Sequence, residues 1–488
     1  MHNNDWLAFD VAYVTIEMLT AFAIGAGKDD GLFDSVFVAD ANGLPCIPGE
    51  SLAGVLRHAV AGSNDPAKDE VCCKAFGFQA RDEGQASLVR VSYAHVHNQA
   101  DKPVPFISAV DDAVLRFLRA GVGRDHVRIG GDGTAVDKGK FDVLLVPAGA
   151  RFTFELMVSR NCPVSLADLV ECLAQPHMRL GGKSRRGIGQ FRLACVRVAH
   201  FDLQKDLARY SKLSPNLPEA VESKDLKAHL WEGIPTWRAF TKKEQLTSSR
   251  VTSDSAPWLH ATLTLEPVGT WVFGGGARRS SQPRNSGADS TDEKDWERLP
   301  MCERRVVWNK GCGSVITQSE SHFLIPGSSV KGALRHRTAY HARRLKGDWL
   351  NPQAPHDAMR PTAEETELFG SVKSENEEQG SPGRLLLSDT YLEQAPYEAQ
   401  QHVSLDRFTQ GPMDHVLFDE LSLGKAKIKL ELSLLQPELE SSRLALEAAL
   451  EDLCHGRLAL GAGRGHGLFR GEIRWKDGRG LQREVAHA

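Results

Sequence analysis

Alternating apolar and polar residues open each half of the chain. The runs VAYVTIE at residues 11–17 and LHATLTLE at residues 259–266 have a period of two, which predicts strands that bury one face. Each run is followed by a Gly-rich turn, a Pro-Gly loop and a helical pattern, then by further strands, another helix and a second Gly-rich loop. This order predicts α+β domains in which helices cover a sheet.

The chain contains an internal repeat. The segment IPGESLAGVLRH at residues 47–58 returns as IPGSSVKGALRH at residues 325–336, with eight of twelve positions identical. The segment RGIGQFR at residues 186–192 returns, in the same order, as RGHGLFR at residues 464–470. Because recurring motifs in a fixed order mark repeated structural units, we expect two domains of the same fold.

The repeat sets the predicted domain boundaries. We assign residues 1–200 to a first domain and residues 256–488 to a second, with insertions near residues 274–320 and 349–383. Residues 201–255 show weak periodicity and are predicted to form a linker. In each Pro-Gly motif a Ser follows the Gly by two positions, which predicts a capped helix N-terminus.

Composition describes a globular protein. The chain has 488 residues, of which 41% are hydrophobic and 25% charged, with a formal net charge of −4. This charge argues against a protein that coats nucleic acid by bulk electrostatics, but it allows a local basic groove. Basic residues do gather in two loops, at Lys183, Arg185 and Arg186, and at Arg278, Arg279 and Arg284.

Sorting signals and cysteine usage suggest the cytoplasm. The N-terminus MHNNDWLAFD lacks the positive charge of a secretory signal, and no run of about 18 apolar residues predicts a membrane span. The nine cysteines are odd in number and irregularly spaced, so we expect them to be reduced. Cys302, Cys312, His322 and His336 are zinc-ligand types, but without a C-x2-C pair they are expected to be scattered.

Together, the repeated motifs resemble the RAMP superfamily, in which a Gly-rich loop lies near the C-terminus of a ferredoxin-like domain. The Pro-Gly segments are similar to the I-P-G-S-S-L-K-G-x-(L/M)-R motif of backbone subunits in type III CRISPR effector complexes. The resemblance covers most of residues 8–200 and 256–476. It implies an α+β protein with two fused ferredoxin-like domains, and guide RNA, target RNA and other effector subunits as partners.

The same motifs carry candidate RNA contacts. Glycines let backbone N–H groups approach phosphate, and a helix N-terminus contributes positive dipole. The predicted RNA-binding residues are Ser51, Arg57, Lys183, Arg185, Arg186, Ser329, Lys331, Arg335, Arg464 and His466. Arg57 and Arg335 could instead pair with a surface acid. The first repeat departs from the family motif, with Glu50 and Ala53 in place of Ser and Lys.

The resemblance also implies a catalytic acid. Backbone subunits that cut target RNA carry an Asp ahead of the Pro-Gly motif, and Asp34 matches it, although Val36 stands where proline is common. A carboxylate can deprotonate or orient the ribose 2′-OH, directly or through Mg²⁺ or a similar divalent cation. We therefore predict a metal-dependent endoribonuclease without an organic cofactor, whose metal ligands the sequence leaves unknown.

The second repeat is predicted to differ at this position. Aligning Gly313 and Ser314 with Asp34 and Ser35 leaves no acid there, which predicts one cutting site and one site that is non-cutting or differently built. Asp289, Asp292 and Asp295 in the nearby insertion read as a solvated charged loop. The resemblance further implies that the stretches from His126 to Val146 and from His402 to Leu423 form hairpins that wedge into the guide–target duplex.

Two alternative functions remain open on the sequence. The chain could hold guide RNA without catalysis, a view that the missing acid in the second repeat favours. It could instead process guide precursors, using His58 or His336 as a general base near the Pro-Gly loops. Asp34 favours target cleavage over both.

Overall fold

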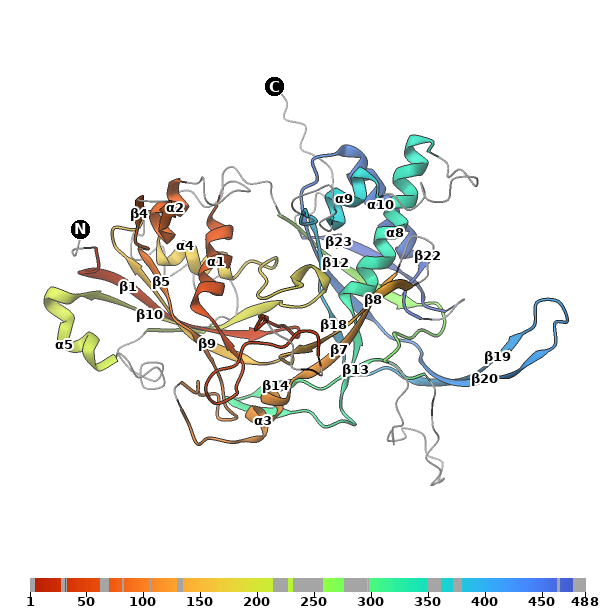
Figure 1. The fold of residues 1–488 in the computed structure, drawn as a ribbon, viewed down its shortest axis with the longest axis horizontal. Helices are drawn as coiled ribbons and strands as arrows, with labels where there is room; N and C mark the ends of the chain where they lie inside the picture. The colour runs from red at the N-terminus through yellow and green to blue at the C-terminus, as the bar shows by residue number, and fades with distance from the viewer. Residues whose placement is uncertain are drawn as a thin grey trace.

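A computed structural model describes most of the chain. The described residues are 5–27, 31, 33–61, 70–80, 83–105, 107–129, 135–213, 227–230, 258–275, 296, 298–348, 361–371, 380–462 and 466–476. Figure 1 shows the two halves of the chain as neighbouring lobes along the long axis of the molecule.

The first domain is built on an antiparallel sheet. Its central strand, β1 (Ala8–Met18), pairs with β10 (Phe191–Asp202) on one side and with β9 (Arg151–Ser159) on the other. The short strands β5 (Val89–Val91) and β6 (Ala94–Val96) pair with β9. The resulting order, with the last strand beside the first, is that of a ferredoxin-like βαββαβ unit.

The second domain repeats this arrangement. β12 (Trp258–Pro267) pairs with β23 (Leu468–Trp475) and with β21 (Ile428–Leu435), which pairs in turn with β17 (Leu385–Leu387). Both sheets are antiparallel and share one strand order. The predicted class, α+β with two fused ferredoxin-like domains, is confirmed.

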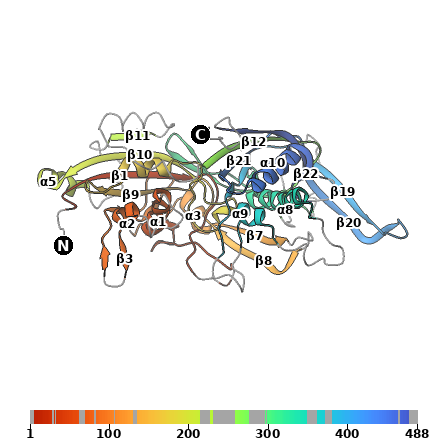
Figure 2. The same cartoon turned by 90° about the horizontal axis from the view of Figure 1, so that it is seen from above.

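Helices cover one face of each sheet. α1 (Gly49–Val60) and α4 (Leu166–Leu173) cover the first, and α8 (Gly327–Lys346) and α10 (Glu440–Cys454) cover the second. Figure 2 shows α1 and α8 on the same side of the molecule, below the strands. Each domain has its own apolar core between sheet and helices, and within the described residues no helix is long and apolar enough to cross a membrane.

Both predicted hairpins are present. β7 (Val122–Ile129) pairs with β8 (Ala135–Leu145), and β19 (Tyr397–Leu405) pairs with β20 (Pro412–Leu423). In Figure 1 the β19–β20 hairpin extends away from the second domain, whereas β7 and β8 reach toward that domain. Phe408, at the tip of β19–β20, is 91% exposed.

The smaller elements connect these parts. They are β2 (Cys46–Ile47), α2 (Glu70–Phe76), β3 (Phe78–Ala80), β4 (Glu83–Gln85), α3 (Ala113–Ala120), the 3-10 turn η1 (Ser184–Arg186), α5 (Leu203–Leu213), β11 (Lys227–Leu230), β13 (Cys302–Glu303), β14 (Val306–Asn309), β15 (Cys312–Val315), β16 (His322–Ile325), α9 (Ala363–Phe369) and β18 (Thr390–Leu392).

Part of the predicted linker is structured. α5 packs against the face of the first sheet opposite its main helices, where Tyr210 contacts Phe9 and Phe201 edge-on. β11 adds a strand to the edge of the same sheet by pairing with β10. Residues 203–213 and 227–230 of the segment predicted as a linker therefore belong to the first domain. The sequence did not predict these elements, because packing against the sheet stabilises a short helix that has only a weak hydrophobic periodicity.

The hairpin β14–β15 lies in the second half of the sequence but packs on the first domain. Val306 is buried in the first domain's core, and its N–H donates to Ala148 O at 3.0 Å. The Trp308 indole donates to Gly149 O at 2.7 Å, and its ring lies 4.5 Å from the Arg151 guanidinium. The two domains are therefore interlocked as well as joined end to end.

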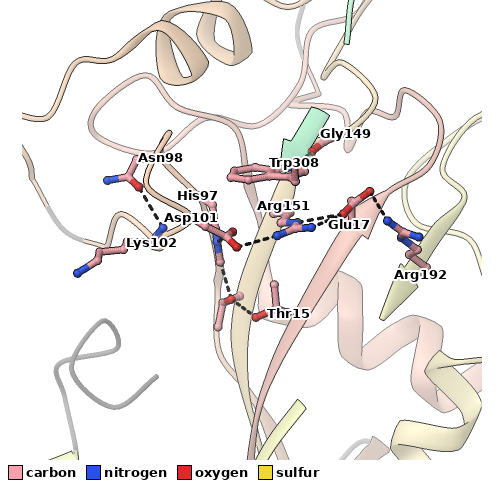
Figure 3. A network of polar contacts seen from close by, with 11 residues as sticks. Thr15, Glu17, His97, Asn98, Asp101, Lys102, Gly149, Arg151, Arg192 and Trp308 are labelled. Carbon is pink, nitrogen blue, oxygen red and sulfur yellow. Dashed lines mark hydrogen bonds and ion pairs between the residues drawn. The ribbon is translucent and has the colours of Figure 1, made fainter. Parts of the chain in front are cut away.

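Beneath Trp308 lies a polar network in the first domain (Figure 3). Arg151 bonds to Glu17 at 2.8 and 3.0 Å and to Asp101 at 2.7 Å. Asp101 in turn contacts the buried His97 ring at 2.8 Å. Because every charged member has a partner, the network can be buried under the indole without an uncompensated charge.

The predicted serine caps are wrong. The N-caps of α1 and α8 are Pro48 and Pro326, and neither helix has a side-chain cap. Instead, the Gly that follows each proline packs against a neighbouring strand end. A Cβ at Gly49 would lie 2.2 Å from Val91 O, so the Pro-Gly pair sets a close helix–strand contact that no larger residue allows.

Candidate nucleic-acid interface

The Gly-rich loop of the first domain docks on the N-terminus of α8 in the second. Asp389 N–H donates to Gly187 O, and Gly327 N–H donates to Asp389 Oδ1, both at 2.8 Å. A Cβ at Gly187 would lie 2.1 Å from Asp389 Oδ1 and 3.0 Å from Gly327 Cα. One motif from each repeat thus forms a single interdomain junction.

A buried charge cluster holds the same junction. Arg124 on β7 is 4% exposed and donates to Glu303 at 2.7 Å through Nη2 and to Tyr391 Oη at 3.1 Å. It also bonds to Asp389. Since Asp389 already accepts from Gly327 N–H, the carboxylate bridges the α8 N-terminus and the β7–β8 hairpin. The dipole of α8 is therefore satisfied within the protein.

Cations from both repeats meet beside this contact. We call Lys183, Arg185, Arg186, Lys331 and Arg335 the junction cations. Burial, together with the charges of Arg185, Arg335 and Arg186, lowers the pKa of Lys331 to about 7. Such mutual repulsion is relieved when an anion binds among the side chains, so the cluster is suited to a phosphate chain.

Individual junction cations are also anchored to the protein. Lys331 Nζ donates to Leu385 O at 3.1 Å and Arg185 Nε donates to Gly383 O at 2.8 Å. Arg335 Nε lies 3.2 Å from Glu365 Oε1, as in the surface-pairing alternative for that residue. These contacts fix the positions of the side chains across the junction.

An aromatic pair lies midway along the β7–β8 hairpin. His126 and Phe141 are stacked with ring centroids 5.0 Å apart. Lys183 Nζ lies 4.7 Å from the centre of the Phe141 ring, and the Arg186 guanidinium 5.2 Å from it. Burial and the nearby Arg124 lower the pKa of His126 to about 4, so the ring is neutral at neutral pH.

Asp34 is exposed at the edge of this cluster and is tied to a second acid. Asp34 N–H donates to Asp142 Oδ1 at 2.9 Å, and Asp142 N–H donates to Asp34 Oδ2 at 3.0 Å. Burial and Arg186 lower the pKa of Lys183, and the charge of Asp34 counteracts this. The structure therefore brings Asp34, Asp142 and Lys183 together. No sequence signal marks Asp142, which lies far along the chain on β8.

The paired carboxylates fit a magnesium ion that keeps most of its water. One oxygen of each carboxylate accepts a hydrogen bond from the backbone of the other residue, and the second oxygen could bind a cation. Mg²⁺ commonly uses one or two carboxylates together with substrate phosphates. Within the described residues, no group of three or more His, Cys, Asp or Glu side chains could hold a metal. Cys302, Cys312, His322 and His336 accordingly form no such group.

The second domain has a counterpart of the aromatic pair. His402 and Phe418 face each other across β19–β20 and stack at 5.0 Å, as His126 and Phe141 do. His466, from the second Gly-rich loop, contacts the His402 ring edge-on at 5.6 Å and bonds to Thr270 Oγ1 through Nδ1 at 2.8 Å. His402 and Phe418 therefore occupy the positions equivalent to His126 and Phe141.

The alignment of Gly313 with Asp34 is wrong. Ser35 O accepts from Leu144 N–H on β8, and Arg298 O accepts from Leu421 N–H on β20 in the same way. Arg298 is thus the counterpart of Ser35, and Gly313 lies in the hairpin that packs on the first domain. The residue before Arg298 is the acid Glu297, which lies outside the described residues. The predicted absence of an acid rested on the wrong alignment.

The remaining predicted contacts have varied surroundings. Ser51 and Ser329 lie in the first turns of their helices, where their N–H groups donate to Pro48 O and Pro326 O at 3.0 Å. Arg57 Nη2 lies 4.0 Å from Cys73 Sγ, so its guanidinium points toward α2. Arg464, Arg278, Arg279, Arg284, Asp289, Asp292 and Asp295 lie outside the described residues.

The architecture defines the class of the protein: two ferredoxin-like domains, each with a Gly-rich loop after the second of the helices that cover its sheet (α4 and α10), joined through one of those loops. The model of the RAMP superfamily matches residues 15–192 and 308–470. The chain therefore belongs to the RAMP superfamily.

Two further comparisons add little to this assignment. A search of the curated proteins finds no match. Among solved structures, a chain of "Type III-B Cmr-beta Cryo-EM structure of the Apo state" is 16% identical, with a TM-score of 0.29, and the match covers 38% of this chain and 96% of that one. At this level the similarity supports no argument about function.

Proposed function

We propose that this protein binds guide RNA across its domain junction as a tandem backbone subunit of a type III CRISPR effector complex, and that it cuts paired target RNA at Asp34. The observation that carries the proposal is the convergence of cations from both repeats beside the Gly-rich loop. Guide RNA, target RNA and other effector subunits are the expected partners, in the cytoplasm.

The junction suits a continuous phosphate backbone. Arg186 of the first repeat acts electrostatically both on Lys183 of the same repeat and on Lys331 of the second. Contacts to phosphate position an RNA strand without reading its sequence, as a guide of variable sequence requires. The net charge of −4 makes this local concentration of cations more selective than a uniformly basic surface would be.

Asp34 lies where a bound strand would pass Lys183. Its carboxylate would accept the proton of a ribose 2′-OH or orient that group for attack on the adjacent phosphate. Asp142 fixes the Asp34 loop against β8 through the paired backbone bonds. A divalent cation held by these two carboxylates would supply stabilisation of the phosphate charge, and Lys183 would add a fixed positive charge from the protein.

The test compares cleavage of labelled RNA complementary to the guide by complexes containing wild type or Asp34→Ala. We expect Asp34→Ala to lower the Mg²⁺-dependent cleavage rate by about 100-fold or more with guide RNA content unchanged. Asp111→Ala, which changes an exposed acid at the start of α3, is the matched control and should cut normally. Normal cutting by Asp34→Ala would reduce the protein to a guide-RNA holder.

The precursor-processing alternative gains no support at its predicted bases. His58 and His336 are both exposed on their helices, and neither has a hydrogen bond that would orient it as a base among the contacts of the described residues. A processing activity in this protein would have to arise elsewhere on the RNA path.

A further inference from the structure

The face of the second sheet opposite α8 and α10 carries an open polar hollow. Thr262 and Thr264 form its floor, and on β12 they alternate with Leu263, which belongs to the core on the other face. The hollow has a volume of about 440 Å³. Charged side chains at β21 and β23 form its two walls, Lys427, Lys429 and Glu431 on one side and Glu472, Arg474 and Lys476 on the other. We call this hollow the β12 groove.

The strand register explains the shape of the groove. Each threonine lies between two long charged side chains of the neighbouring strands, Thr262 between Glu431 and Arg474, and Thr264 between Lys429 and Glu472. Because neighbouring strands lie about 4.8 Å apart, the two walls stand roughly 10 Å apart. This width admits one extended chain and is too narrow for a double helix.

The acids of the groove already have partners. Glu431 accepts a hydrogen bond from Thr262 Oγ1 at 3.0 Å and lies 3.4 Å from Lys476 Nζ. Glu472 lies 2.5 Å from the Arg474 guanidinium. The charge that these contacts leave uncompensated is therefore positive.

This positive charge lies at the β21 wall. Lys427 and Lys429 are two positions apart at the start of β21, and Lys425 comes just before them. All three are exposed, and within the described part of the chain none of them has an ion pair. Alternate residues of an extended chain lie about 7 Å apart, a spacing comparable to that of successive phosphates in an extended nucleic-acid strand. The wall can therefore pair with consecutive phosphates of one strand.

The equivalent surface of the first domain is covered. Thr15, which holds the register position of Thr264, is 7% exposed and bonds to Thr153 Oγ1 at 2.7 Å. His97 Nε2 contacts the same oxygen at 2.7 Å, and the hairpin β14–β15 covers the surface beside it. The open groove is therefore a property of the second domain and is not required by the shared fold.

We infer that the β12 groove binds single-stranded RNA through its phosphates. Charge complementarity carries the choice of ligand, since unpaired cations line a polar trough of single-strand width. A protein partner would need apolar contacts at the centre of its interface. The groove floor instead presents hydroxyl groups, and Trp475, the aromatic residue that lines it, packs against the core. Contacts to phosphate read no sequence, so the groove accepts any single strand.

The inference goes beyond the proposed function. The groove faces away from α8, whose N-terminus forms the junction, so a strand bound in it does not compete with guide RNA for the junction cations. Binding in the groove requires neither Asp34 nor a guide. It gives the protein a second contact with RNA, suited to a strand that is not paired with the guide.

The groove is closed at the domain boundary. There the His177 ring of the first domain stacks on Trp258 at 4.4 Å and on His260 at 5.7 Å, at the start of β12. A bound strand therefore extends from this boundary toward the other end of β12. The site is short, with room for about four nucleotides.

The test crosslinks an oligonucleotide of 4-thiouridine to the full-length protein with ultraviolet light and maps the modified peptides by mass spectrometry. We expect crosslinks in β12 and at the start of β21. The double change Lys427→Glu with Lys429→Glu should lower their yield by about 10-fold. Lys205→Glu, which makes the same kind of change at an exposed lysine of α5, is the control and should leave the yield unchanged.

A second variant separates the groove from diffuse charge. Thr264→Trp fills the floor without changing any charge, so it should also lower the crosslink yield in β21 by about 10-fold, while circular dichroism shows wild-type folding. Thr264→Ser keeps the groove open and should behave as wild type. Undiminished crosslinking of Thr264→Trp would mean that the overall charge of the surface holds the RNA, and would overturn the site.

The outcomes separate the two proposals. Crosslinks confined to the junction cations would overturn the groove and leave the proposed function standing. Crosslinks in the groove of a protein that neither retains guide RNA nor cuts target RNA would do the opposite. Binding of a labelled oligoglutamate in the groove, with no RNA crosslink there, would identify an acidic protein as the partner and would also overturn the inference.

Discussion

Lys331 is the residue at which the repeat, the junction and the proposed RNA path coincide. It matches the Lys of the family motif, and burial lowers its pKa to about 7 together with Arg185 and Arg186 of the first-domain loop and Arg335 of its own helix. A lysine so close to half-protonation responds to small changes in its surroundings.

The predicted consequence is a pH-dependent affinity for guide RNA. As pH rises through about 7, Lys331 loses its charge in the RNA-free protein. Binding phosphate then requires Lys331 to be protonated again, which costs free energy. The affinity for guide RNA should therefore fall several-fold between about pH 6 and about pH 8.5. Fluorescence anisotropy of a labelled guide at fixed low salt measures this fall. Lys331→Arg should keep high affinity at both values, and Lys331→Met should be weak at both. A wild-type affinity independent of pH would contradict the assignment.

At the element scale, the hairpin β14–β15 decides how firmly the domains are joined. This hairpin belongs to the second half of the sequence but covers the polar network of the first domain, where Trp308 contacts Arg151 and Gly149 (Figure 3). A flat indole over a guanidinium adds dispersion and electrostatic attraction to the apolar burial.

Removing this contact should destabilise the first domain. We expect Trp308→Ala to lower the free energy of unfolding by about 2 kcal/mol, because the partly buried ring leaves a cavity and an unpartnered Gly149 carbonyl. Urea unfolding followed by circular dichroism measures the change. Ser314→Ala, on the exposed side of β15, should stay within about 0.5 kcal/mol of wild type, and an equal effect of the two changes would refute the role of Trp308.

Over the whole molecule, the Arg124 cluster makes the two domains one unit. Arg124 is buried against Glu303, Asp389 and Tyr391 of the other domain. Buried ion pairs contribute little net stability when intact, but removing one partner leaves uncompensated charge. The cluster therefore specifies how the domains dock more than it strengthens the fold.

Arg124→Met should thus have a large effect. We expect a loss of about 3–5 kcal/mol and separate unfolding transitions for the two domains in calorimetry. The exposed Arg116→Met provides the matched control, with one transition near that of wild type. A double variant, Arg124→Met with Asp389→Asn, should recover part of the loss, because it removes one of the stranded carboxylates. No recovery would mean that the Arg124–Asp389 pair is not the origin of the effect.

The sequence determined much of the fold because its signals are local. Strand alternation in β1 and β12, the glycines of both loops and the recurring Pro-Gly motif each depend on neighbours along the chain. They predicted two α+β domains of one fold, and the resemblance that they carry implied the ferredoxin-like core and both hairpins. The same resemblance implied Asp34 as the catalytic acid, and that role stays a prediction.

Only the tertiary structure decided which of these motifs meet. The Gly-rich loop of one repeat docks on the Pro-Gly helix of the other, and Asp142 joins Asp34 from a distant strand. The hairpin β14–β15 packs on the first domain. Gly313, which lies in it, is therefore not the counterpart of Asp34 that the sequence alignment had predicted. Such contacts depend on packing and charge pairing between residues far apart in the sequence. Hydrophobic periodicity and sequence motifs predict only the local backbone structure around each partner.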